Sequence, residues 1–168
     1  MKEDNIGNVL GALAEWVTAQ VRSAVALEGL TPAEVSALLL LSKYPDRSIE
    51  LLRAPLELSH SGCVRLVDRL VQGGYVERRE GEDARKVALH LTLQGREFAR
   101  IANAQRAESL ARLLHGLGAQ EREHLGQLAS RLLEQSISQE STAMKVCRLC
   151  DYDACVECPF DGLGPQGQ

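Results

Sequence analysis

The stretch Leu58-Ser-His-Ser-Gly-Cys-Val-Arg-Leu-Val-Asp-Arg-Leu70, followed by Gly73-Gly74, decides the fold of this chain. Serine is favoured at the residue before a helix, and paired glycines are typical of a helix end, so a helix is predicted between Ser59 and Gly73. Polar and basic side chains lie on one face of this helix. The other face carries four apolar residues at helical spacing, which predicts their burial: Cys63, Leu66, Val67 and Leu70.

The neighbouring segments turn this helix into part of a larger motif. Upstream, Thr31-Pro-Ala-Glu34 has the residue types of a helix start, and a short helix over 49–54 is expected to end at Pro55. Downstream, residues 75–79 and 86–91 alternate as strands do, around a polar segment that suits a hairpin tip. The order of elements predicts a helix-turn-helix with a hairpin wing.

Long amphipathic helices are predicted on both sides of this motif, over 5–27, from Thr92 onward, and over 119–139. Their apolar stripes are longer than a small winged-helix core could cover, so a second copy of the chain is the expected partner. The fold class is mainly α with a small β-hairpin wing: a winged helix-turn-helix flanked by long dimerisation helices. The expected parts are 1–30 and 92–140 for dimerisation, 31–91 for the winged helix, and 145–168 as a cysteine-rich tail.

Composition excludes several classes of protein. The chain has 168 residues, of which 45% are hydrophobic and only 4% aromatic, with a formal net charge of −4. This apolar content is ample for a core and excludes wholesale disorder. No run approaches the roughly 18 apolar residues that span a bilayer, and no secretory leader is recognised, so a cytoplasmic protein without membrane contact is expected.

The motifs together resemble the MarR family of bacterial transcriptional regulators over about residues 5–139. The resemblance is carried by the stretch 58–70 and by Leu30-Thr-Pro-Ala-Glu34, Gly74-Tyr-Val-Glu-Arg-Arg79, Asp83-Ala-Arg85 and Leu91-Thr-Leu-Gln-Gly-Arg96. It implies a homodimer with interlocked terminal helices that presents two winged helices to successive turns of double-stranded DNA. The segment from Glu50 to Ser59 departs from the family because it is one residue longer and carries Pro55.

Position along the motif suggests which residues contact DNA. Ser59 is expected to cap the recognition helix (59–73) near a phosphate, and Arg65 is the candidate for bidentate contact with guanine. In the family, the arginine that matches Arg85 in the wing (75–91) approaches the minor groove, oriented by the match to Asp83. The full set of candidate DNA-binding residues is Ser59, His60, Ser61, Gly62, Val64, Arg65, Arg69, Arg78, Asp83, Arg85 and Lys86.

Two observations temper this set. Between residues 60 and 86, six basic residues face five acidic ones, so DNA affinity is expected to be modest and strongly dependent on salt. An exposed arginine on a helix is more often a solvated charge, and only the context favours Arg65 as a DNA contact.

Cys63 lies on the apolar face and is interpreted as a buried small hydrophobe rather than a sensor thiol.

The tail contains Cys147-x2-Cys150-x4-Cys155-x2-Cys158-Pro159, a spacing that lets four thiolates converge on one centre. The compact spacer and the final Cys-Pro suit an iron–sulfur cluster, although no ferredoxin motif is matched in full. Zinc is the second candidate, and metal-free thiols that form disulfides under oxidant are the third.

The leading hypothesis is a dimeric regulator, expected to be a repressor and not an enzyme, whose DNA binding depends on a redox- or iron-sensing tail. One alternative is a regulator that responds to a phenolic or lipophilic small molecule, with Zn²⁺ as a structural clasp in the tail. A further alternative is a redox or protein-interaction protein without DNA binding. No catalytic constellation is recognised in the sequence.

Overall fold

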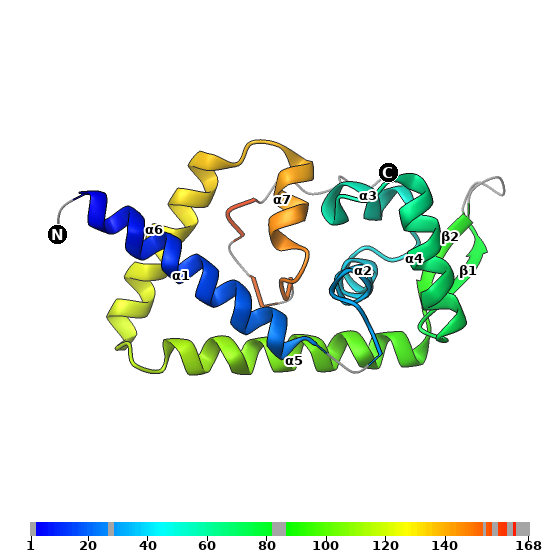
Figure 1. Cartoon of the computed structure of the whole chain (residues 1–168), viewed down its shortest axis with the longest axis horizontal. Coiled ribbons are helices and arrows are strands. Elements are labelled where there is room, and N and C mark those ends of the chain that lie inside the picture. Colours follow the sequence, from blue (N-terminus) through cyan, green and yellow to red (C-terminus); the bar gives the residue numbers. More distant parts are fainter. Residues whose placement is uncertain are drawn as a thin grey trace.

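A computed structural model describes residues 3–26, 29–81, 87–152, 154–155, 158–160 and 163. Its elements follow the predicted order, with helices at both ends and the winged helix between them. Figure 1 shows α5 running along the length of the molecule, with the hairpin at one end and α6 at the other. The elements are α1 (Glu3–Ala24), α2 (Pro32–Lys43), α3 (Glu50–Leu56), α4 (His60–Gln72), β1 (Val76–Glu80), β2 (Val87–Leu91), α5 (Leu93–Leu114), α6 (Ala119–Ser136) and α7 (Glu140–Cys147).

The helix α2 forms the centre of the winged helix. It begins with the predicted capping box, in which Thr31 and Glu34 satisfy each other's backbone N–H groups. The helix is buried from Glu34 to Leu41, because α3, α4 and β2 pack on one side and α5 on the other. The core that results contains large fully buried side chains from all of these elements except α5, among them Leu38, Leu40, Leu52, Leu66, Leu70 and Leu89.

The end of α3 differs from the prediction. The helix was expected to stop at Ala54, but it continues through a buried Pro55 to Leu56. A proline inside a helix removes one hydrogen bond and does not prevent the following residues from closing the turn. Here the N–H groups of Glu57 and Leu58 donate to the carbonyls of Ala54 and Arg53 at 3.2 and 3.1 Å, with Glu57 in the left-handed region at φ 54°.

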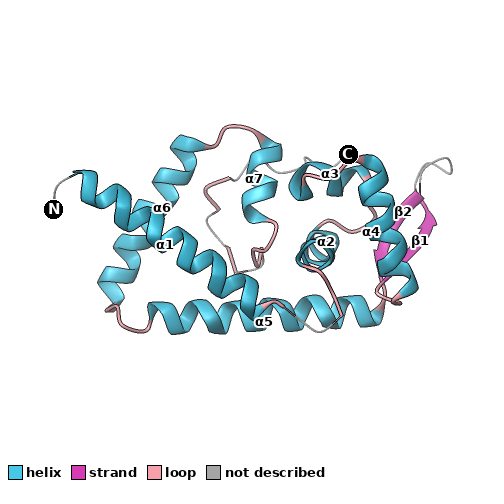
Figure 2. Ribbon diagram, in the orientation of Figure 1, coloured by secondary structure: helices cyan, strands magenta, loops and turns pink. Residues whose placement is uncertain are grey.

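The wing is a two-stranded antiparallel hairpin in which Val76 pairs with Leu91 and Glu80 with Val87. Figure 2 shows that the strands lie at one end of the molecule, beside α4. Thr92 joins the hairpin to α5, since its hydroxyl accepts from the Gly95 N–H at 3.1 Å and donates to the Gly74 carbonyl at 2.6 Å. This confirms the predicted cap at Thr92.

The helices α1 and α6 leave apolar side chains exposed. Val25, just after α1, packs against side chains of α2 and α5, and Val21 near the end of α1 is buried. Residues 5–16 of α1 are exposed, and α6 has no buried residue. The exposed apolar residues on these two helices are Ile6, Val9, Leu10, Leu13, Trp16, Leu125, Leu128 and Leu132. None of the helices in the described ranges is long and apolar enough to cross a membrane.

The helix α7 was not predicted, and it begins before the expected boundary of the tail at residue 145. It packs against α3, and its Met144 is only 7% exposed within the winged-helix core. The cysteine-rich segment that follows turns back into the middle of the molecule (Figure 1). The tail therefore packs on its own chain.

Candidate functional site

The outer face of α4 has the composition that its sequence predicted. Cys63, Leu66, Val67 and Leu70 are buried, which confirms the predicted core face. Ser61 and Arg65 are exposed, and Gly62 and Val64 are half-buried. Within the part of the chain that the structure describes, the Arg65 guanidinium has no hydrogen-bond or ion-pair partner. Its five donors are therefore directed to solvent or to a ligand.

The first turn of α4 is fixed by side-chain hydrogen bonds. Ser59 caps the helix, as predicted: its hydroxyl accepts from the Gly62 N–H at 3.1 Å and lies 3.2 Å from the Ser61 hydroxyl. His60 pairs through Nδ1 with Glu50 Oε1 at 2.9 Å, a contact that the sequence did not suggest. Hydrogen bonds from Arg53 and then His60 hold the pKa of Glu50 below its usual range. The helix start is thus tied to the start of α3.

Arg69 lies one turn after Arg65 on α4 and is held by a carboxylate of α2. Its Nε donates to Glu34 Oε1 at 2.6 Å, and the Glu34 side chain is only 4% exposed. Burial acts to raise the pKa of Glu34, but hydrogen bonds from Thr31 and Arg69 outweigh it and leave that pKa below its usual value. Arg69 thus anchors α4 to α2, and among the residues described its other N–H groups are left for a ligand or solvent.

The wing carries the other predicted contacts. Arg78 Nη2 lies 2.8 Å from Asp68 Oδ1, so this arginine joins β1 to α4. Its neighbour Arg79 pairs with Glu77. Asp83, Arg85 and Lys86 lie outside the described residues, so their predicted roles stay predictions.

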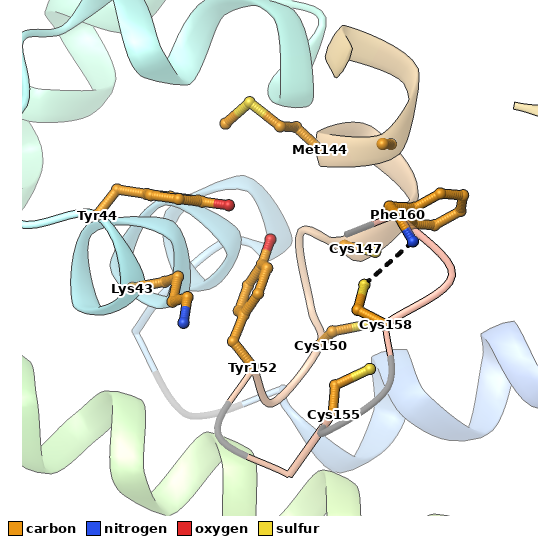
Figure 3. Close-up of a pocket in the computed structure, with 10 residues that line it drawn as sticks. Lys43, Tyr44, Met144, Cys147, Cys150, Tyr152, Cys155, Cys158 and Phe160 are labelled. Atoms are coloured by element: carbon orange, nitrogen blue, oxygen red, sulfur yellow. Dashed lines mark hydrogen bonds between the residues drawn. The ribbon is translucent and has the colours of Figure 1, made fainter. Parts of the chain in front are cut away.

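The four cysteines of the tail line a single cavity of about 190 Å³. Figure 3 shows Cys147 at the end of α7 and the other three on the loop that follows, around the same space. None of the five cysteines in the chain forms a disulfide. The remaining lining residues come from α2, α7 and the end of the tail: Lys43, Tyr44, Ala143, Met144, Tyr152 and Phe160.

N–H groups from α5 and from the tail itself approach two of the sulfur atoms. Arg106 Nη2 from α5 lies 3.8 Å from Cys150 Sγ, and the Phe160 backbone N–H donates to Cys158 Sγ at 3.4 Å. A hydrogen bond from Cys147, with the charge of Arg106, lowers the pKa of Cys150 to about 6, while the same bond raises the pKa of Cys147. The cavity therefore favours one thiolate at its Cys150 side.

The four thiols are suitable donors for a metal, but their side chains are too far apart to bind one ion together. Four sulfur donors suit zinc or an iron–sulfur cluster, and N–H groups directed at sulfur are typical around such centres. However, no three His, Cys, Asp or Glu side chains in the described ranges are gathered closely enough to hold one ion. The thiols surround the cavity, and binding would require them to move inward.

An aromatic pair closes one side of this cavity and was not predicted. The rings of Tyr44 and Tyr152 meet edge to face with centroids 5.7 Å apart, and Lys43 Nζ lies 5.4 Å from the centroid of Tyr152. Burial raises the pKa of both tyrosines. The pair fixes the loop between the two cysteine pairs onto the end of α2.

A family model described as the MarR family matches residues 28–86, which contain α2, α3, α4 and β1. The transcriptional repressor MprA of Escherichia coli strain K12 is 31% identical to the chain over 111 residues, 64% of this chain and 63% of that protein. The chain is therefore similar to MarR-family proteins over its winged helix. This confirms the resemblance stated from the sequence.

Solved structures share the fold of this chain. RV1404 from Mycobacterium tuberculosis has a TM-score of 0.73 at 23% identity, covering 82% of this chain and 97% of that one, which confirms the predicted fold. A probable transcriptional regulator from Pseudomonas aeruginosa has a TM-score of 0.57 at 26% identity, and the match covers 77% of this chain and 98% of that one. MarR-family proteins are transcriptional regulators rather than enzymes, in agreement with the expectation from the sequence. The match to MprA spans less than two thirds of its length.

Proposed function

We propose that this chain is a MarR-family transcriptional repressor that binds double-stranded DNA through α4 and the wing. The observation that carries the proposal is the outer face of the first half of α4, on which Arg65 is exposed and has no partner among the described residues. An unpaired guanidinium at this place can form two parallel hydrogen bonds with a guanine edge in the major groove. Its relative MprA is named as a repressor.

The other predicted residues fit supporting roles in this proposal. Ser61, Gly62 and Val64 lie beside Arg65 on the side of α4 that would face base edges. Ser59 and the helix start would lie near a phosphate, because the first N–H groups of a helix favour an anion. Arg78, with its charge shared with Asp68, is suited to the backbone rather than to bases.

We further propose that the active form is a homodimer. The apolar residues exposed on α1 and α6 would be buried against a second copy, in which the same two helices are available. A two-fold dimer presents two α4 helices, and these would contact half-sites of a pseudo-palindrome about one helical turn apart. Sedimentation or light scattering on the full chain measures this state directly.

DNA binding is tested by selection of bound sequences from a random pool, followed by titration of the selected duplex. Arg65→Ala should weaken binding by about 1–3 kcal/mol, roughly 5- to 150-fold, and should relax the preference at one base pair. The control is Arg100→Ala on α5, which removes an arginine whose partner is Glu97. Equal affinity of the Arg65→Ala variant and the unmodified dimer would refute the assignment of α4, and retention of no DNA at low salt would favour a protein-interaction role.

We also propose that Cys147, Cys150, Cys155 and Cys158 bind a metal centre, either an iron–sulfur cluster or Zn²⁺. The proposal is supported by the shared cavity and by the N–H groups directed at Cys150 and Cys158. Metal and acid-labile sulfide analysis of protein purified without oxygen tests it. Iron with sulfide supports a redox- or iron-responsive centre, stoichiometric zinc supports a structural clasp, and a metal-free product leaves four thiols as the sensor.

A small-molecule effector is the second candidate for control of this regulator. It is favoured by the aromatic and apolar walls of the thiol-lined cavity, which include Tyr44, Met144, Tyr152 and Phe160. Apolar walls with a few polar groups are typical of ligand pockets. Titration of a panel of phenols into the metal-loaded dimer–DNA complex distinguishes this role, since only an effector would release DNA while the metal stays bound.

A further inference from the structure

The helix α7 connects the cysteine cluster to α3, the helix that precedes the recognition helix. Its last residue is Cys147, the first of the four thiols. One turn earlier, Met144 is 7% exposed within the same core cluster as Leu66 and Leu70 of α4. A single turn of helix therefore separates a proposed metal ligand from a side chain in the core beneath α4.

A second contact of α7 reaches the turn from which α4 begins. Lys145 Nζ lies 2.7 Å from Glu57 Oε1, and Glu57 is the residue that ends α3, two residues before the helix cap Ser59. Glu57 has φ 54°, a left-handed conformation that residues with a Cβ adopt only when their surroundings hold it. The conformation of the α3–α4 turn therefore depends on the contacts that its neighbours make with it.

The two contacts differ in strength. The Lys145 and Glu57 side chains are 42% and 66% exposed, and exposed ion pairs contribute little to stability. Burial of Met144 contributes more, because its side chain is removed from water by the core. Met144 therefore acts as the anchor of α7, and the Lys145–Glu57 pair sets where α7 meets the turn.

The opposite side of the tail contacts two other helices. Arg106 of α5 donates to Cys150, and Tyr152 packs on Tyr44 at the end of α2. The tail thus spans from α5 to the α3–α4 turn, as Figure 1 shows for α7 and the loop after it. A change in the loop can shift α7 relative to α5, because α5 and α7 are attached to its two sides.

We propose that α7 transmits the state of the four-cysteine site to the recognition helix. Metal binding draws Cys147 to the other three thiols, fixes the end of α7, and so holds Met144 and Lys145 against the α3–α4 turn. Loss of metal frees that end and loosens the start of α4. This inference rests on the proposed metal site and adds the route by which that site controls DNA binding.

Hydrogen exchange of the full-length protein, with and without one equivalent of Zn²⁺ per chain, tests this route. The amount of zinc bound per chain is measured beforehand. Zinc should slow exchange of residues 60–72 on the order of tenfold in the unmodified protein. Met144→Ser should keep zinc and abolish this change, because α7 loses its anchor. Val146→Ser is the matched control, since Val146 lies on the same helix and is 44% exposed.

A charge swap covers the case in which Met144→Ser disturbs folding. Lys145→Glu should reduce the zinc effect on residues 60–72, and the double variant Lys145→Glu with Glu57→Lys should restore it. Absence of bound zinc in the unmodified protein would overturn the metal site and this inference with it. Bound zinc that protects residues 147–158 but leaves residues 60–72 unchanged would overturn the inference alone.

Discussion

Arg69 of the recognition helix and Glu34 of α2 form an ion pair at 2.6 Å in which the carboxylate is almost fully buried and the guanidinium is 54% exposed. Glu34 also accepts from the backbone N–H and the hydroxyl of Thr31, both at 2.7 Å. One carboxylate therefore caps α2 and fixes the position of α4. A buried carboxylate that loses its partners keeps its cost of desolvation, so this pair is expected to matter more than the exposed ones.

Replacement of Arg69 should reveal the desolvation cost of the buried Glu34 carboxylate. We expect Arg69→Met to lower the free energy of unfolding by about 2 kcal/mol, because the buried carboxylate is left without its charged partner. Urea unfolding at pH 7 measures the loss. Arg100→Met, which removes an exposed partner of Glu97, should change stability by less than about 0.5 kcal/mol. Similar losses in both variants would contradict the special role of the Glu34–Arg69 pair.

The same carboxylate predicts a pH dependence of stability. The pKa of Glu34 is lowered in the folded chain, so its ionised form stabilises the fold at every pH above the unfolded-state pKa of about 4.3. As the pH falls through that value and then through the folded pKa, the contribution disappears. The stability difference between the unmodified protein and Glu34→Gln should therefore shrink on acidification. A difference that stays constant from pH 7 to below pH 4 would count against this account.

Gly95 is expected to tolerate no side chain. A Cβ at this position would lie 2.1 Å from the Tyr75 carbonyl oxygen, where the start of α5 crosses the chain that enters the hairpin. Gly95→Ala should cost about 3 kcal/mol or prevent folding, because backbone atoms cannot move aside cheaply. Gly126→Ala on α6 meets nothing within 4 Å and should gain up to about 1 kcal/mol from helix propensity. Thermal unfolding of both variants compares them, and a stable Gly95→Ala protein would show that the crossing can open.

Arg106 should affect metal binding from outside the ligand set. Its guanidinium donates to Cys150 Sγ, and loss of such a partner typically lowers metal affinity by roughly 10- to 100-fold. Competition with a chromophoric zinc chelator measures this for Arg106→Gln. Arg112→Gln is the matched control on the same helix, because Arg112 pairs with the exposed Glu108. Unchanged zinc affinity in the Arg106→Gln variant would mean that the Cys150 contact does not survive metal binding.

Local rules were sufficient for most of the fold. The caps at Thr31, Ser59 and Thr92 depend on hydrogen bonds over three residues, and all three were predicted. The buried face of α4 also follows from helical spacing alone. Pro55 shows the limit of such rules, because it is buried and α3 continues through it to Leu56.

The cysteine spacing by itself determined that the tail carries four thiols able to converge, and the sequence also determined which face of α4 is polar. Only the tertiary structure decided that α7 exists, that the tail packs on its own chain, and that Arg69 is held by Glu34. The deciding contacts join residues 35, 44 and 88 positions apart: Glu34–Arg69, Arg106–Cys150 and Glu57–Lys145. No local pattern contains such pairs, because each forms only once the packing of several helices has brought distant segments together.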